Sequence, residues 1–324
     1  MPSILLALLT IVNWSSLAFL TVKVARLPST FSVGVALTIG GLVGLARVRD
    51  WKIPRQTLLI GVCGIFGYHA LLFAAFRLAP AVEVNLINYL WPLLIVLLSP
   101  LFLRGHRIKA HNAIGAALGL CGVFLIASGG RVGLELVSLP GYLLAAAAAL
   151  IWASYSLLTK RVAPFPTGAV GAFCLVSGIL SMAVSLAAAA VSGNITALVP
   201  RSSEWLFLAI LGLGPMGSAF YTWDAALKRG DPRIIGALSY LTPLLSTLNL
   251  VVFGGKRLTP LSALAMALII AGAVVGSLGG IGGSRFRAAR HASAASIGVK
   301  GRSDGSSRRD TDQRDDLSAE KPFR

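Results

Sequence analysis

Long apolar runs, separated by short polar breaks, fill the first 283 residues of this chain. A helix needs about 20 apolar residues to cross the hydrocarbon core of a membrane. Runs close to that length occur in ten places, and each predicts one transmembrane helix. The predicted helices span residues 3–22, 31–47, 57–76, 81–103, 110–128, 139–158, 167–192, 205–227, 233–254 and 260–282.

The two ends of the chain carry different signals. Residues 3–22 lack a basic segment in front and a convincing cleavage site behind, so they predict a retained first helix rather than a signal peptide. Residues 284–324 are rich in Arg, Asp, Ser and Gly and nearly lack large apolar side chains. Such a segment cannot bury enough apolar surface to fold, and it predicts a disordered tail.

The composition agrees with a membrane protein. Hydrophobic residues make up 56% of the chain and charged residues only 13%, whereas a soluble domain carries about 25% charged residues. The mean hydropathy is +0.79. The surface is therefore expected to be largely apolar, with the lipid bilayer around it.

The net charge of +17 comes from Lys and Arg in the short loops and in the tail. No basic helix face appears, so no nucleic-acid partner is expected. If the N-terminus is cytoplasmic, the cytoplasmic loops hold twelve Lys and Arg and the tail ten more, against seven in the opposite loops. This bias predicts a multi-pass protein of the bacterial inner membrane with both termini, and hence the tail, in the cytoplasm.

Three cysteines, Cys63, Cys121 and Cys174, all lie inside apolar runs. The sequence contains no Cys-x-x-Cys pair and no Cys/His cluster, so the cysteines are expected to be small packing residues. We therefore expect no disulfide framework, no metal site and no cofactor.

The chain contains an internal repeat. Residues 88–94 read Asn-Tyr-Leu-Trp-Pro-Leu-Leu and residues 239–245 read Ser-Tyr-Leu-Thr-Pro-Leu-Leu, which is five identities in seven positions at an offset of 151. The same offset continues without a gap from the third predicted helix through the fifth. It also aligns the loop charges Arg77 and Lys228.

The first predicted helix aligns with the sixth at a smaller offset of 138, which pairs Trp14 with Trp152. Because five helices are an odd number, the second copy must start from the opposite face of the membrane. The sequence therefore predicts an all-α membrane protein of ten transmembrane helices, arranged as two inverted five-helix repeats over residues 1–133 and 134–283. Many secondary transporters have this architecture, since two inverted halves can open a central site to alternate sides.

Two five-helix repeats, each with a Tyr-Leu-x-Pro-Leu-Leu sequence in its fourth helix, resemble the drug/metabolite transporter superfamily, EamA-type. The first version of this sequence, with Tyr68-His69 upstream, is similar to the YddG-type aromatic amino-acid exporters. The resemblance to the superfamily covers residues 3–282. It implies a secondary transporter that exports aromatic and related neutral amino acids by alternating access.

Polar and aromatic side chains within the predicted helices are candidate substrate contacts, because their burial against lipid is costly. In the fourth helix, Asn85, Asn88 and Tyr89 follow the spacing i, i+3, i+4 and share one face. Similar stripes in the sixth, eighth and ninth helices predict one shared, aromatic-lined cavity. The candidate substrate-binding residues are Trp14, Tyr68, His69, Asn85, Asn88, Tyr89, Trp91, Trp152, Tyr155, Tyr221 and Tyr240.

His69 and two prolines in the predicted helices each allow more than one interpretation. His69 is either a buried packing residue or a hydrogen-bonding partner for a substrate carboxylate or amine, and its counterpart in the second repeat is Phe220. Pro92 and Pro243 occupy equivalent places in the two repeats and each removes a backbone hydrogen bond. They predict either a structural kink or a hinge that shapes the cavity.

Acidic residues are scarce in the predicted helices. The first and sixth helices contain none, whereas small multidrug members of the resembled superfamily rely on a membrane-embedded Glu in the first helix. This difference argues against obligatory proton coupling and leaves His69 as the alternative proton carrier. Asp224 lies four residues before Lys228 and predicts an ion pair along one helix face.

Other function classes find little support. The sequence has no nucleophile elbow, Walker loop or metal-ligand spacing, so we expect neither an enzyme nor an ATP-driven pump. Pairs of glycines four residues apart, Gly115 with Gly119 and Gly272 with Gly276, predict close packing within one chain and favour a monomer. An exporter of another small metabolite or drug, or a lipid scramblase-like protein, remains an alternative.

Overall fold

The computed structural model describes residues 2–103, 105, 107–128, 136–254, 260–261 and 263–276. These residues are helices and short connections, and no strand occurs among them. They form one compact unit. The predicted tail and the end of the tenth predicted helix lie outside the described residues.

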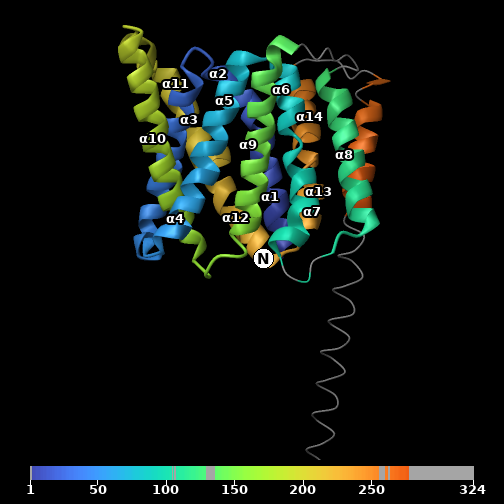
Figure 1. Ribbon diagram of the computed structural model, residues 1–324. Helices are drawn as coiled ribbons and strands as arrows, with labels where there is room; N and C mark the ends of the chain where they lie inside the picture. Colours follow the sequence, from blue (N-terminus) through green and yellow to red (C-terminus); the bar gives the residue numbers. More distant parts are fainter. Residues whose placement is uncertain are drawn as a thin grey trace, which may run out of the picture. The chain divides into compact units, whose positions relative to one another are not determined.

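Seven helices in the described part of the chain are long and apolar enough to cross a membrane, and each coincides with a predicted span. Figure 1 shows them side by side in one bundle. They are Ser3–Lys23, Ser29–Trp51, Arg55–Leu78, Glu83–Phe102, Leu136–Leu158, Thr167–Val191 and Ser202–Arg229. Ala110–Leu125 and Ala263–Gly276 are shorter apolar helices. An arrangement of ten helices in two repeats stays a prediction.

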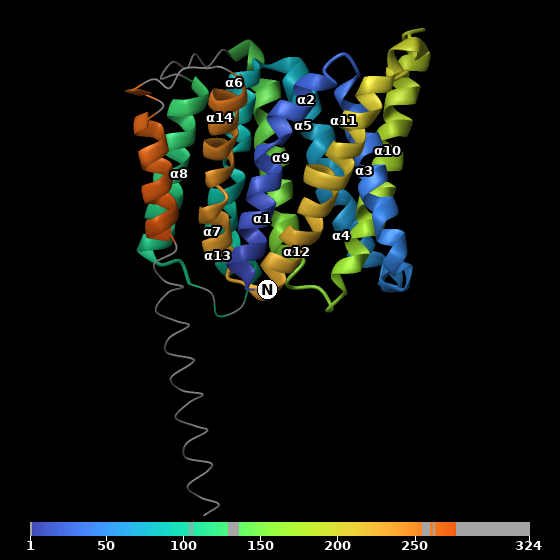
Figure 2. The ribbon, with the colours of Figure 1, turned by 180° about the vertical axis from the view of Figure 1, so that it is seen from behind.

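Several spans consist of two helical segments that meet at an irregular turn. In chain order, all the α-helices that carry labels, broken or not, are α1 (Ser3–Ser15), α2 (Leu17–Lys23), α3 (Ser29–Val43), α4 (Arg55–Val62), α5 (Tyr68–Leu78), α6 (Ala81–Asn88), α7 (Trp91–Phe102), α8 (Ala110–Ser128), α9 (Leu139–Leu158), α10 (Val170–Val191), α11 (Ser202–Leu213), α12 (Ala219–Arg229), α13 (Pro232–Leu238) and α14 (Leu241–Gly254). Seen from behind in Figure 2, α14 lies beside α1, and the two helices contact each other.

One kind of irregular turn is a single π-helical turn, in which each backbone hydrogen bond spans five residues instead of the four of an α-helix. Cys63–Gly67 forms such a turn between α4 and α5, and Gly214–Ser218 forms another between α11 and α12. The second turn begins and ends 151 residues after the first. The space beside the first turn is tight, because a Cβ atom at Gly64 would lie 2.3 Å from the Tyr155 ring.

The other kind of irregular turn precedes the two repeated prolines. The α6 helix ends at Asn88 and α7 begins at Trp91, so Pro92 occupies the first turn of α7. The α13 helix likewise ends at Leu238, and α14 begins two residues before Pro243. A proline is tolerated in the first helical turn, where its missing N–H has no partner to lose. Each predicted kink is therefore a break at which a new helix begins.

Some residues occupy equivalent positions in the two repeats, at the offsets of 138 or 151, and contact each other in the bundle. The contacts join Trp14 to Trp152 (5.8 Å between ring centroids), His69 to Phe220 (6.4 Å) and the Tyr240 hydroxyl to the Tyr89 carbonyl (3.2 Å). Paired contacts between equivalent residues are typical of a two-fold axis.

Glycines bring α8 against the helix Ala263–Gly276. A Cβ atom at Gly115 would lie 2.3 Å from the Gly276 backbone nitrogen, and one at Gly272 would lie 2.6 Å from the Gly115 carbonyl oxygen. These glycines therefore pack against each other within the chain, as their spacing predicts. Of the three free cysteines, Cys174 is buried in the core, whereas Cys63 and Cys121 are exposed.

Candidate functional site

A cavity of about 710 Å³ opens between the helices. One end of it, called the mouth here, is lined by Pro28, Ser29 and Arg77, which lie in or beside the α2–α3 and α5–α6 connections at the upper end of the bundle in Figure 1. At the other end, called the floor, lie Trp14, Trp91 and Trp152. The cavity therefore reaches from one surface of the bundle to a buried aromatic cluster.

Eight of the residues predicted to bind substrate line this cavity. Seven of them lie on α1, α5, α6, α7 and α9, and Tyr89 lies between α6 and α7. The eight are Trp14, Tyr68, His69, Asn85, Asn88, Tyr89, Trp91 and Trp152.

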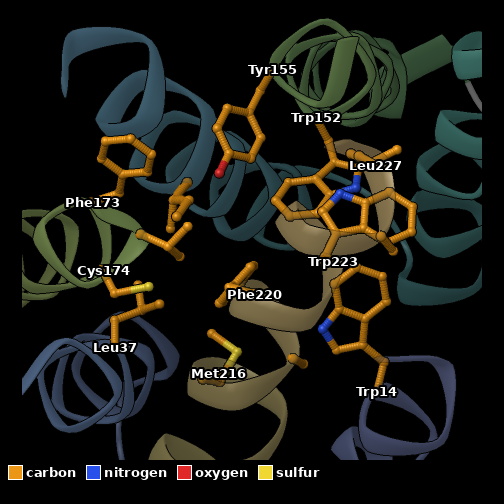
Figure 3. Close-up of a cluster of buried hydrophobic side chains, with 14 of the residues drawn as sticks. Trp14, Leu37, Trp152, Tyr155, Phe173, Cys174, Met216, Phe220, Trp223 and Leu227 are labelled. Carbon is orange, nitrogen blue, oxygen red and sulfur yellow. The ribbon is translucent and has the colours of Figure 1, made fainter. Parts of the chain in front are cut away.

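The floor is built from tryptophans that meet edge to face. The Trp14 ring centroid lies 6.1 Å from that of Trp91, with 84° between the planes, and 5.8 Å from that of Trp152. Trp223 packs behind them at 5.1 Å from Trp14 (Figure 3). Such geometry is favourable for aromatic pairs. The Trp14 indole also donates to the Pro215 carbonyl, so its orientation is fixed by a π-helical turn.

His69 presents a hydrogen-bond acceptor to the cavity. Its Nδ1 lies 2.7 Å from the Ile65 carbonyl oxygen, which belongs to the first π-helical turn. A carbonyl oxygen only accepts hydrogen bonds, so Nδ1 must carry the proton. The Nε2 atom of the neutral ring is then an acceptor.

Asn88 presents a second acceptor. Its amide nitrogen donates to the Tyr68 hydroxyl at 3.1 Å, while its carbonyl Oδ1 is buried without a partner among the described residues. The Thr242 hydroxyl oxygen is in the same condition and also lines the cavity. A buried polar atom without a hydrogen bond is costly, but both oxygens have almost no accessible surface, so a ligand in the cavity would meet them only after neighbouring side chains shift.

Three predicted site residues do not line the cavity. Tyr155 packs against Trp152, with 5.5 Å between the ring centroids. The Tyr221 hydroxyl donates to the Gly40 carbonyl at 3.0 Å, and Tyr240 is completely buried. In this conformation each of the three side chains contacts other parts of the protein and is not available to a ligand in the cavity.

The cavity also contains residues that the sequence reading did not select. Most are apolar, such as Phe73, Phe76, Met216 and Phe220, and nothing in the sequence separates them from lipid-facing residues. Arg77 is the one charged residue on the cavity wall in the described part of the chain. In the sequence it resembles an ordinary loop charge.

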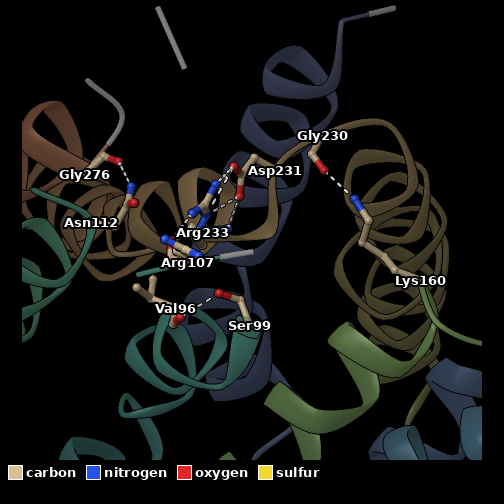
Figure 4. Close-up of polar contacts among 9 residues, drawn as sticks. All are labelled: Val96, Ser99, Arg107, Asn112, Lys160, Gly230, Asp231, Arg233 and Gly276. Carbon is tan, nitrogen blue, oxygen red and sulfur yellow. Dashed lines mark hydrogen bonds and ion pairs between the residues drawn. The ribbon is translucent and has the colours of Figure 1, made fainter. Parts of the chain in front are cut away.

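Polar contacts seal the end of the bundle opposite the mouth, called the closed end here. Lys160 donates to the Gly230 carbonyl at 2.6 Å, and the Arg233 guanidinium binds Asp231 and donates to the Arg107 carbonyl (Figure 4). Burial lowers the pKa of the Lys160 ammonium, and the Asp231 carboxylate partly offsets this effect.

An ion pair lies deeper at the closed end. Lys228 Nζ is 2.6 Å from Asp224 Oδ2, which confirms the predicted pair along α12. The Thr167 hydroxyl donates to the same carboxylate oxygen at 2.7 Å. Lys228 also donates to the Phe165 carbonyl at 2.9 Å and lies 3.5 Å from the centre of the Phe165 ring. The α9–α10 connection is thereby fixed to the end of α12.

Among the described residues, no group of three or more His, Cys, Asp or Glu side chains gathers where it could hold a metal ion.

Comparison with known proteins identifies the family. The model of the EamA-like transporter family matches residues 1–128 and 139–278. The aromatic amino acid exporter YddG of Ancylobacter novellus is 43% identical over 85% of this chain and 96% of its own length. The protein of the same name from Escherichia coli K12 is 29% identical over 75% of this chain and 85% of its own length. A crystal structure with 41% identity gives a TM-score of 0.79 and covers 85% of this chain and 96% of its own chain. The chain belongs to the EamA-like transporter family.

Proposed function

We propose that the protein is a secondary transporter that exports aromatic and related neutral amino acids across the bacterial inner membrane by alternating access. Two relatives, at 43% and 29% identity, are named aromatic amino acid exporters. The observation that carries the proposal is a cavity with a tryptophan floor and a wall of neutral hydrogen-bond acceptors. Such a cavity fits a ring at one end and an ammonium group beside it.

The floor suits an aromatic side chain. Trp14, Trp91 and Trp152 already pack edge to face, and a substrate ring can add to the same arrangement. An aromatic pair contributes about 0.5–1.5 kcal/mol beyond the area that it buries. Several such contacts would favour phenylalanine, tyrosine and tryptophan over aliphatic amino acids.

The wall suits a zwitterion better than a cation. His69 Nε2 and Asn88 Oδ1 are acceptors and can receive hydrogen bonds from a substrate ammonium group. No Asp or Glu lines the cavity among the described residues, and Arg77 is positive. A cationic drug would therefore lack a compensating charge, whereas a zwitterion carries its own carboxylate.

An architecture of two inverted five-helix repeats, residues 1–133 and 134–283, accounts for several features of the fold. The family model matches the chain in two consecutive segments. The π-helical turns recur at the offset of 151, and so do the breaks before Pro92 and Pro243. Equivalent residues also contact each other, as a two-fold axis would require. We propose that the two prolines hinge the halves.

The charge bias gives the cavity a direction. With both termini in the cytoplasm, the closed end carries the Lys- and Arg-rich connections and faces the cytoplasm. The mouth then faces the periplasm, so this conformation would be the one that releases substrate.

Obligatory proton coupling has little support. The first and sixth helices contain no acid. Asp224 lies at the closed end, bound to Lys228 and Thr167, and does not line the cavity. A proton from the mouth would reach His69 but not Asp224, so transport down the substrate gradient is the simpler mechanism, with His69 as the alternative proton carrier.

Transport by the purified protein in liposomes tests this function. We expect radiolabelled phenylalanine, tyrosine and tryptophan to enter protein-containing liposomes in the absence of a proton gradient. Uptake equal to that of empty liposomes for all three would refute the proposal, and uptake only with a proton gradient would refute the uncoupled mechanism. A drug or a lipid moved instead would favour one of the alternatives.

Competition by substrate analogues tests the assignment of the cavity wall. Phenylpropionate lacks the ammonium group that His69 and Asn88 are proposed to bind, so we expect it to compete about tenfold less well than phenylalanine. His69→Phe should reduce this difference, because it removes one acceptor and copies the residue at the equivalent position, Phe220. Trp205→Phe, a change at a half-exposed position away from the cavity, is the matched control. Equal competition by both compounds in the natural protein would contradict the assignment.

A further inference from the structure

We propose that Arg77 closes the mouth of the cavity by donating a hydrogen bond to the Leu27 carbonyl in the opposite conformation, in which the closed end is open. This inference rests on the alternating access proposed above. It assigns to Arg77 a contact that the structure contains only at the other end of the bundle, between Lys228 and the Phe165 carbonyl.

The contact at the closed end has three parts. Lys228 donates to the Phe165 carbonyl at 2.9 Å and covers the Phe165 ring at 3.5 Å. Asp224 receives hydrogen bonds from Lys228 and from Thr167. Residues 165–167 are therefore held against the end of α12, and this seal blocks the cavity at that end.

The connection that carries Phe165 has a counterpart at the mouth. Residues 23–29 read Lys-Val-Ala-Arg-Leu-Pro-Ser, and residues 161–167 read Arg-Val-Ala-Pro-Phe-Pro-Thr. The offset of 138 found for the first helix continues through this segment, where three of the seven positions are identical. Three further positions carry residues of the same kind: a basic residue first, a large apolar residue fifth and a hydroxyl residue last. It pairs Leu27 with Phe165. In both segments the proline directly precedes a helical turn, at Pro28 before α3 and at Pro166 before Thr167–Ala169.

The cation has a counterpart as well. The offset of 151 pairs Lys228 near the end of α12 with Arg77 near the end of α5. Leu27 and Arg77 both line the mouth in this structure, one on the α2–α3 connection and one on α5. Arg77 is exposed there. In this structure the end of α12 contacts the α9–α10 connection. If the two halves exchange conformations, the end of α5 makes the equivalent contact with the α2–α3 connection.

The two seals are not equally strong. The counterpart of Asp224 is Phe73, so Arg77 has no acid one turn before it. Arg77 would seal the mouth through hydrogen bonds alone, although its guanidinium carries five donors against three for a lysine. The structure has its mouth open and its other end sealed, which agrees with the stronger seal being the one that is formed.

Thiol labelling tests the seal without any substrate. Ser246 lines the cavity, and Ser246→Cys is placed in a chain whose natural cysteines, Cys63, Cys121 and Cys174, are replaced by serine or alanine. A membrane-impermeant maleimide is added from the mouth side, to spheroplasts or to inverted vesicles according to the orientation found. Lys228→Met leaves the buried Asp224 carboxylate without its partner and weakens the seal at the closed end, so labelling from the mouth side should fall about a hundredfold as the mouth closes.

Second-site changes then identify the residue that closes the mouth. Adding Arg77→Met to Lys228→Met should restore labelling from the mouth side, whereas Arg77→Lys should leave it low. Lys23→Met is the matched control, because Lys23 lies at the same end but does not line the cavity, and it should not restore labelling. If Arg77→Met restores nothing while the protein elutes as a single species, the inference is wrong. Since no transport is measured, a protein that moves some other solute gives the same labelling result.

Discussion

The two ends of the bundle are held together in different ways. At the closed end the Asp224 side chain is only 1% exposed and the Lys228 side chain 22%, and the pair links α12 to the α9–α10 connection through the Phe165 carbonyl and the Thr167 hydroxyl. At the mouth end, Arg26 pairs with Glu204 at 2.6 Å, with the arginine side chain 36% exposed and the glutamate side chain 7% exposed. Both carboxylates are buried, so the two pairs differ mainly in the exposure of the cation and in the connections that they join.

This difference has an energetic consequence. Removal of one partner from a buried ion pair costs about 3–5 kcal/mol, because a charge is left buried without compensation. An exposed pair contributes about 0–1 kcal/mol. Deleting one partner of the pair at the closed end is therefore expected to cost more than deleting the pair at the mouth end.

Loss of Asp224 should have the largest effect. Asp224→Ala leaves Lys228 buried without its partner and should weaken the closed end by about 3–5 kcal/mol, so labelling of Ser246→Cys from the mouth side should fall by about a hundredfold or more. The double variant Asp224→Leu with Lys228→Met removes both charges and should recover much of that loss. Unchanged labelling in Asp224→Ala would show that the ion pair does not hold this end closed.

Loss of Lys160 should have an intermediate effect. Lys160→Met removes the hydrogen bond to the Gly230 carbonyl, and an acceptor left without a donor costs about 1–3 kcal/mol. We expect labelling from the mouth side to fall about tenfold. Lys52→Met, at an exposed lysine of the same end, serves as the control. Equal effects of the two variants would place Lys160 outside the seal.

Loss of the pair at the mouth end should have the smallest effect. Arg26→Met combined with Glu204→Gln removes a partly exposed ion pair and should cost about 1 kcal/mol, seen as a drop of about 2–4 °C in the melting temperature. Labelling of the cavity should stay unchanged, because the pair does not cross the mouth. A loss of labelling as large as that of Lys160→Met would remove the distinction between the two ends.

The sequence predicted most of the helices and much of the cavity wall. Apolar length alone placed the seven longest helices, and the spacing of Asn85, Asn88 and Tyr89 correctly grouped three cavity residues on one face. The same spacing also selected Tyr240, which is completely buried and packs so closely on Gly119 that a Cβ atom there would lie 2.5 Å from its ring. A stripe defines a face of a helix, but the helix that packs on it decides whether the face meets a cavity.

Two features could not be predicted because they depend on the assembled bundle. The π-helical turn that holds His69 packs tightly through Gly64 against Tyr155, which lies far away in the sequence. Arg77 has the composition of a topological loop charge, and only its place at the mouth, opposite Leu27, gives it another role. In both cases a contact over a long sequence distance decides the function of a residue.

The central claim is that one cavity serves both sides of the membrane by exchanging the end that is sealed. Counterflow tests it most directly. Liposomes that contain the purified protein are loaded with unlabelled tryptophan, and the entry of labelled tryptophan is followed. We predict faster entry than into unloaded liposomes, because internal tryptophan binds the inward-facing site and the loaded site then returns to the outside. Entry at a rate that does not depend on internal tryptophan would indicate a continuously open path and would contradict the account.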